Sequence, residues 1–85
     1  MKTIISQKAV EIIADILNRQ ETARQLLREA EARTEAARNY MMADPSIDNA
    51  LELHNAMKQA AVRRQQLADL DKALEHAALR DFYTL

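Results

Sequence analysis

The chain of 85 residues contains no glycine, no cysteine and no tryptophan, and it contains a single proline. Without cysteine it cannot form disulfide bonds, thiolate zinc sites or a thiol nucleophile. Without glycine it lacks the residue that phosphate-binding loops, nucleophile elbows and dinucleotide-binding turns need where the backbone approaches a ligand closely. These absences exclude whole classes of enzyme, and the length allows one domain, which we place over residues 1–85.

The chain also lacks an excess of either charge and a long apolar run. Twelve basic residues stand against 13 acidic residues, which gives a net charge of −1. Such a balance creates no overall field that would attract nucleic acid or an anionic membrane. Lys2, Lys8, Glu11 and Asp15 interrupt the apolar start of the chain, so no membrane span or signal segment is expected. We therefore expect a cytoplasmic protein without a membrane or nucleic-acid partner.

What the chain has is helical periodicity. Apolar residues recur at spacings of three and four over residues 4–42, which predicts one long amphipathic helix. The polar run at residues 18–22 is its weakest point, because Gln20 occupies a position where the apolar stripe requires a larger hydrophobic side chain. A break there, with Thr22 capping a fresh helix, is the alternative and would give three helices.

A turn is expected at residues 43–46, around the single proline. Asp44 is our first choice as the N-cap of a second helix, with Pro45 at the first helical position, and Ser46 is the alternative cap. Asp48 then places negative charge near the positive end of the helix dipole. The second helix is expected at about residues 46–82.

Both helices carry residues repeated every seven positions. In the first helix one line consists mostly of small residues and a second line mostly of larger ones. In the second helix one line is mostly leucine, and further apolar residues lie beside it. The first two lines are Ala9, Ile16, Ala23, Ala30 and Ala37, and Ile13, Gln20, Leu27, Thr34 and Met41. The second helix contributes Leu53, Ala60, Leu67 and Leu74, supported by Met57, Leu70, Ala77 and Ala78. A short loop and a seven-residue period predict an all-α, antiparallel, coiled-coil-like helical hairpin.

Two helices with an alanine-rich seam leave apolar side chains at their flanks. The flanking residues are Ile4, Val10, Leu17, Leu26, Tyr40, Leu51, Val62 and Leu79. A homodimeric four-helix bundle or another helical protein would cover them, and a folded-back N-terminal segment or a marginal monomer are the alternatives.

Residue types that carry catalysis or metal binding are sparse. His54 and His76 lie 22 positions apart, and neither is preceded at three residues by the glutamate that di-metal bundles use. The close carboxylate pairs have arginine or lysine nearby, which is typical of solvated ion pairs. We therefore expect no enzyme activity, no cofactor, no metal and no small-molecule substrate.

The expected function is non-enzymatic protein binding through helix packing, in a structural or regulatory role. Arg63 and Arg64 flank the leucine line of the second helix, where they either cover apolar surface with their stems or pair with carboxylates of a partner. The candidate interface residues are Ile12, Ile16, Leu26, Leu53, Met57, Arg63, Arg64 and Leu67.

Two families are similar in outline. A small helical hairpin that dimerises around an alanine-rich seam resembles the Rop plasmid copy-number regulators, which implies RNA binding, although the arginines of the first helix form no continuous basic stripe. Asp44-Pro45 followed by a helix rich in Gln and Ala resembles the cytoplasmic co-chaperones of type III secretion needle subunits. Phage-encoded inhibitors of host complexes fit the same description.

Overall fold

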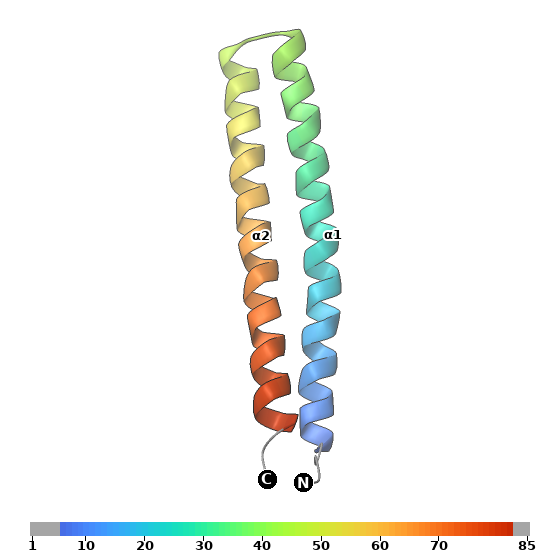
Figure 1. Ribbon diagram of the computed structural model, residues 1–85. Coiled ribbons are helices and arrows are strands. Elements are labelled where there is room, and N and C mark those ends of the chain that lie inside the picture. The colour runs from blue at the N-terminus through green and yellow to red at the C-terminus, as the bar shows by residue number, and fades with distance from the viewer. Residues whose placement is uncertain (1–5, 83–85) are drawn as a thin grey trace.

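The computed structural model describes residues 6–82, which form two long helices lying side by side in opposite directions (Figure 1). Helix α1 spans Gln7–Ala43 and helix α2 spans Ile47–Phe82. The molecule is a rod with extents of 64 × 14 × 14 Å. The prediction of an all-α antiparallel hairpin is confirmed, and the first turn of α1 lies beside the last turn of α2, at the end away from the connection.

Helix α1 begins after a side-chain cap that the sequence analysis missed. Ser6 has extended backbone angles, and its Oγ accepts a hydrogen bond from the N–H of Ala9 at 3.1 Å. A serine in this conformation satisfies one of the free N–H groups of the first turn. The expected start near Ile4 lies outside the described residues, and within them the helix begins at Gln7.

The break expected as an alternative at residues 18–22 is absent, because α1 is continuous from Gln7 to Ala43. Thr22 caps no new helix, and its hydroxyl instead donates to the carbonyl oxygen of Asn18 at 3.3 Å, one turn earlier. Gln20 is buried against α2 with 3 % exposure. Its position in the seam is compatible with a continuous helix because the amide finds a hydrogen-bond partner on the other helix.

The connection between the helices corrects our choice of cap. Asp44 is the C-cap of α1, with its N–H donating to the carbonyl oxygen of Tyr40 at 2.9 Å. Ser46, our alternative, caps α2, and its Oγ accepts from the N–H of Asn49 at 3.1 Å. Pro45 disfavours the helical conformation for the residue before it, which suits Asp44 to ending a helix. No described residue has a positive φ angle, so the connection does not require glycine.

The seam of α1 is the one predicted from the seven-residue repeat. Ala9, Ile16, Ala23, Ala30 and Ala37 are all buried. On α2 the most buried residues are Ala56 and Ala60, which are both 0 % exposed. Met57, which we placed in the seam, is 51 % exposed and the assignment is wrong. The second line of the α2 seam is instead Ala56, Arg63, Leu70 and Ala77, which alternates with the Leu53 line at spacings of three and four.

Candidate interaction surface

The contact between the two helices is narrow. Its fully buried positions are alanines, and none of the larger side chains at residues 6–79 has less than 2 % exposure. Leucines of the seam, such as Leu53 and Leu67, are half-buried. Alanine at the closest positions lets the helix backbones approach, but it buries little apolar area in doing so.

The predicted interface residues fall into three groups. Ile16, Leu53 and Leu67 lie in the seam between α1 and α2, so they serve the hairpin itself. Arg63 is also a half-buried seam residue, Ile12 and Leu26 are half-buried at the margins of the seam, and Met57 and Arg64 are exposed. The structure therefore does not bring these eight residues together on one surface, because some of them face the other helix and others point away from it.

The hairpin has two broad faces, one on each side of the plane that contains both helix axes. We name them after a residue on each. The Arg33 face includes Ile12, Arg19, Thr22, Leu26, Arg33 and Tyr40 of α1 and Glu52, Gln59, Val62, Gln66 and Asp69 of α2. The Met57 face includes Val10, Ala14, Leu17, Glu21, Arg24, Arg28, Glu31, Glu35, Arg38 and Met42 of α1 and Ile47, Ala50, His54, Met57, Ala61, Arg64, Ala68, Asp71, Glu75 and Ala78 of α2.

On the Arg33 face one arginine ties the two helices together. The Nε and Nη2 atoms of Arg33 donate to Oε1 of Glu52 at 2.9 and 2.7 Å, and Nη1 donates to Oε1 of Gln59 at 3.1 Å. All three bonds run from α1 to α2. The guanidinium group thus spans two successive turns of α2, as its planar arrangement of donors allows.

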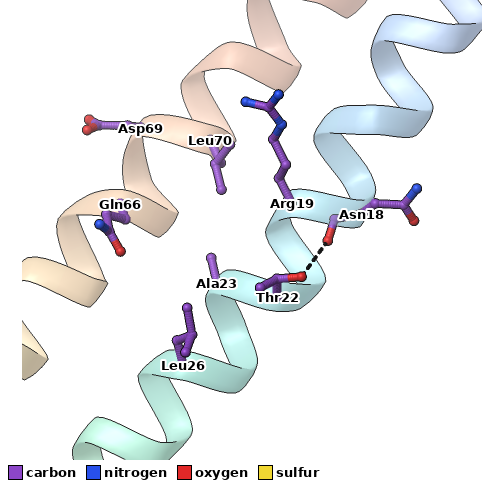
Figure 2. A pocket seen from close by; sticks show the side chains of 8 residues that line it. All are labelled: Asn18, Arg19, Thr22, Ala23, Leu26, Gln66, Asp69 and Leu70. Carbon is purple, nitrogen blue, oxygen red and sulfur yellow. Dashed lines mark hydrogen bonds between the residues drawn. The ribbon is translucent and has the colours of Figure 1, made fainter.

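The same face contains a groove of about 530 Å³ between the helices (Figure 2). Ala23, Leu26 and Leu70 supply its apolar surface. Asn18, Arg19, Thr22, Gln66 and Asp69 supply the polar side chains. The groove is shallow and open, and Arg19 pairs with Asp15 of its own helix at 2.9 Å rather than with a residue across the groove. It could accept an apolar side chain from a partner, but it does not enclose a substrate.

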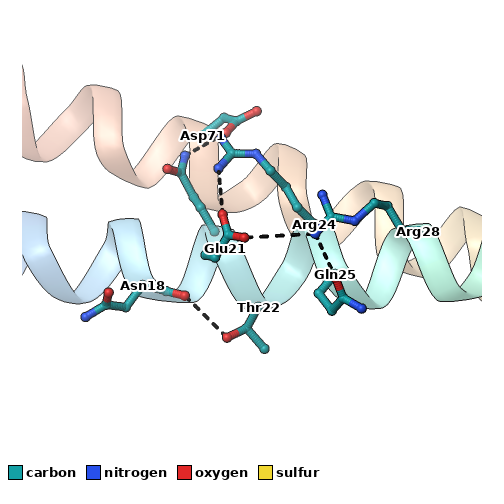
Figure 3. A network of polar contacts seen from close by, with 8 residues as sticks. Asn18, Glu21, Thr22, Arg24, Gln25, Arg28 and Asp71 are labelled. Carbon is teal, nitrogen blue, oxygen red and sulfur yellow. Dashed lines mark hydrogen bonds and ion pairs between the residues drawn. The ribbon is translucent and has the colours of Figure 1, made fainter.

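The Met57 face carries a charged cluster on α1 next to Asp71 of α2 (Figure 3). Glu21 lies between two arginines, with ion-pair distances of 3.8 Å to Arg24 and 3.9 Å to Arg28. Further along the helix Arg38 pairs with Glu35 at 3.2 Å. These side chains are roughly half to three-quarters exposed, so each pair contributes little to stability.

Large hydrophobic side chains remain exposed along the whole rod. The described chain exposes Val10, Leu17, Tyr40, Met42, Ile47, Leu51, Met57, Val62 and Leu79. Six of these were expected from the sequence as flanking residues, whereas Met42, Ile47 and Met57 were not. Leu26, which we also expected at the flank, is half-buried. Five of the nine lie on the Met57 face, namely Val10, Leu17, Met42, Ile47 and Met57.

Other kinds of site are not found in the described part of the chain. No group of three or more His, Asp or Glu side chains among residues 6–79 is arranged to hold a metal ion. Neither described helix combines the length and the apolar character needed to cross a membrane. Comparison of the chain with protein-family models, with curated proteins and with solved structures finds no match.

Proposed function

We propose that the hairpin is a non-enzymatic binding module that acts by packing its exposed apolar side chains against helices of a protein partner. One observation carries this proposal. The seam consists of alanines and half-buried leucines, whereas nine large hydrophobic side chains lie outside the seam and are exposed. Single exposed hydrophobic residues are normal on protein surfaces, but several on one face of a rod are typical of an interface.

The accessible surface supports the same proposal. The hairpin exposes 6465 Å². A compact monomer of 9.7 kDa exposes about 5,100 Å² by the usual scaling with mass. The excess of roughly 1,300 Å² is more than the about 800 Å² that each partner buries in a standard interface. The rod therefore exposes enough surface for one complete interface.

The charges favour a protein partner over RNA. All five arginines on α1 have a carboxylate within 4 Å. The pairs are Arg19 with Asp15, Arg24 and Arg28 with Glu21, Arg33 with Glu52, and Arg38 with Glu35. Binding to phosphates depends on positive charge that is not compensated nearby. The mixed surface of this hairpin suits partners of mixed charge.

The proposal is tested by photo-crosslinking in the organism that makes the chain. A photoreactive amino acid replaces Leu17, on the Met57 face, or Gln25, an exposed polar position on the outer side of α1. We expect a covalent protein adduct from position 17 that is absent or much weaker from position 25. Equal labelling at both positions, or adducts to RNA alone, would overturn the proposal.

A further inference from the structure

The Met57 face has a charge pattern that fits a second copy of itself. We propose that two hairpins pack through this face in opposite directions, with α1 against α1 of the second copy, and that the pairing is centred between Arg28 and Glu31. This inference rests on the proposed function and names its partner. The arrangement is a two-fold dimer, in which the same patch serves both copies.

The evidence is the order of charges along α1. The outward positions of this face repeat at spacings of three and four, as the positions of a coiled-coil seam do. When one α1 is laid antiparallel on another about the stated centre, every charged residue of the row meets an opposite charge, and Leu17 meets Met42. The charge pairs are Glu21 with Arg38, Arg24 with Glu35, and Arg28 with Glu31. Each pair occurs twice in the dimer.

Neighbouring registers do not share this property. A slip of one heptad in one direction places Glu21 opposite Glu31 and Arg24 opposite Arg28. A slip in the other direction places Arg28 opposite Arg38 and Glu31 opposite Glu35. Like charges directly opposite one another weaken a pairing, so the pattern selects one register out of three.

The other two-fold arrangement is also disfavoured. If the two hairpins lay parallel, α1 would face α2 of the second copy at the same height along the rod. Gln20 is level with Asp71, as their hydrogen bond shows, so Glu21 would meet Asp71 of the second copy. Arg28, two turns further along, would meet Arg64. Parallel packing therefore places like charges together on both helices.

On α2 the same face is suited to close approach. Two contacts show how α1 and α2 are aligned, because Arg33 bonds to Gln59 and Gln20 bonds to Asp71. The centre of the α1 pairing, between Arg28 and Glu31, therefore lies level with about Ala61 of α2. The outward positions around it are Met57, Ala61, Arg64 and Ala68, which are all exposed. Arg64 is the one charged residue among them, and its long stem can carry the guanidinium group to the edge of the contact. The small side chains of Ala61 and Ala68 leave room for the two copies of α2 to approach each other.

The size of the contact is adequate for a stable dimer. Residues 16–43 of α1 overlap in the proposed register, which is about 42 Å at 1.5 Å per residue. This is about two-thirds of the 64 Å rod. A contact of this length over both helices can use the roughly 1,300 Å² by which the hairpin exceeds a compact monomer, and a standard interface needs about 800 Å² from each copy.

Charge reversal tests the register directly. Glu21→Arg should weaken the dimer about tenfold in Kd, because two attractive pairs per dimer become repulsive. The double change Glu21→Arg with Arg38→Glu should restore it. Residues 21 and 38 are about 25 Å apart within one helix, so rescue requires contact between two chains. The matched control is Glu29→Arg, an exposed glutamate on the other side of α1, which should leave Kd unchanged.

These Kd values are measured by sedimentation equilibrium over a concentration series, with helicity checked by circular dichroism. A Glu29→Arg variant that weakens the dimer more than Glu21→Arg would overturn the choice of face. Failure of the double change to rescue would overturn the register. A molecular mass that stays at 9.7 kDa at every concentration would overturn the self-association itself. The proposed function would then still be decided by the crosslinking at position 17.

Disulfide trapping gives a second readout that tolerates partial loss of stability. The chain has no cysteine, so single replacements can be compared cleanly. Ala61→Cys, near the two-fold axis, should form a disulfide dimer under mild oxidation faster than Lys58→Cys on the outer side of α2. Gln66→Cys probes the Arg33 face. If Gln66→Cys is trapped faster than Ala61→Cys, or if all three react at the same slow rate, the proposed face is wrong.

Discussion

Gln20 and Asp71 form a hydrogen bond of 2.7 Å between the two helices, from Nε2 of the glutamine to Oδ1 of the aspartate. The two partners differ in environment, because Gln20 is buried and Asp71 is exposed. A buried amide without a partner loses its hydration and gains nothing in return. The bond therefore permits a polar residue to occupy a seam position in the middle of a continuous helix.

This relationship predicts an asymmetry between single and double substitutions. Asp71→Ala should destabilise the hairpin by about 1–2 kcal/mol, because it leaves the Gln20 amide unsatisfied. Gln20→Leu in the same background should recover most of that loss, since the leucine continues the apolar stripe. Urea unfolding at one low protein concentration measures both. If Asp71→Ala costs nothing, water replaces the carboxylate and the bond does not determine the seam.

The alanines of the seam predict sensitivity to larger residues. Ala60 is 0 % exposed, so Ala60→Leu should push the helices apart and cost about 1–3 kcal/mol. The matched control is Ala32→Leu on the outer side of α1, which should change stability by less than about 0.5 kcal/mol. Thermal unfolding followed by circular dichroism compares the two. Similar melting temperatures for both variants would mean that α1 and α2 do not approach through Ala60.

The turn predicts different costs at two neighbouring polar residues. Ser46→Ala removes the oxygen that accepts from the N–H of Asn49, and it should cost about 1 kcal/mol. Asp44→Ala should cost less, because the contacts of Asp44 to Tyr40 and Asn49 use its backbone N–H and carbonyl oxygen. Amide hydrogen exchange at Asn49 provides the specific measurement. If the Asn49 amide exchanges faster in the Asp44 variant than in the Ser46 variant, Asp44 rather than Ser46 caps α2.

The sequence allowed the hairpin and the α1 seam to be predicted because both follow from local spacing. The line from Ala9 to Ala37 repeats every seven residues, and the single proline marks the connection between the two described helices. In α2 the same reasoning failed at Met57, because alanine occupies two neighbouring stripes. Ala56 and Ala60 form one stripe, and Met57 and Ala61 form the other. Spacing alone does not decide which stripe meets α1.

Contacts between distant residues were out of reach for a different reason. Gln20 was recognised as a weak point, but its partner lies 51 positions away, and no local pattern identifies an acceptor at that distance. The Arg33 contacts are of the same kind, since they depend on how the two helices are aligned. Six of the exposed hydrophobic residues could be expected because they lie outside the seven-residue lines that form the seam. Ile47 and Met57 lie on α2, whose seam was not fully determined by local spacing, whereas Met42 was missed beside the turn at the end of α1.

The alignment of the helices gives a last prediction at Arg33, whose guanidinium group contacts both Glu52 and Gln59. Arg33→Lys keeps the charge but loses the planar set of donors, so one of the two contacts must be given up. The side chains of Arg33 and Glu52 are 45 % and 52 % exposed, which limits the expected loss to less than about 1 kcal/mol and makes it smaller at high salt. Urea unfolding at low and high salt measures the difference. Arg19→Lys is the matched control, since Arg19 pairs only within its own helix with Asp15 and should show a smaller loss. A loss at Arg33 that does not decrease with salt would indicate that the arginine acts through packing of its stem rather than through its charge.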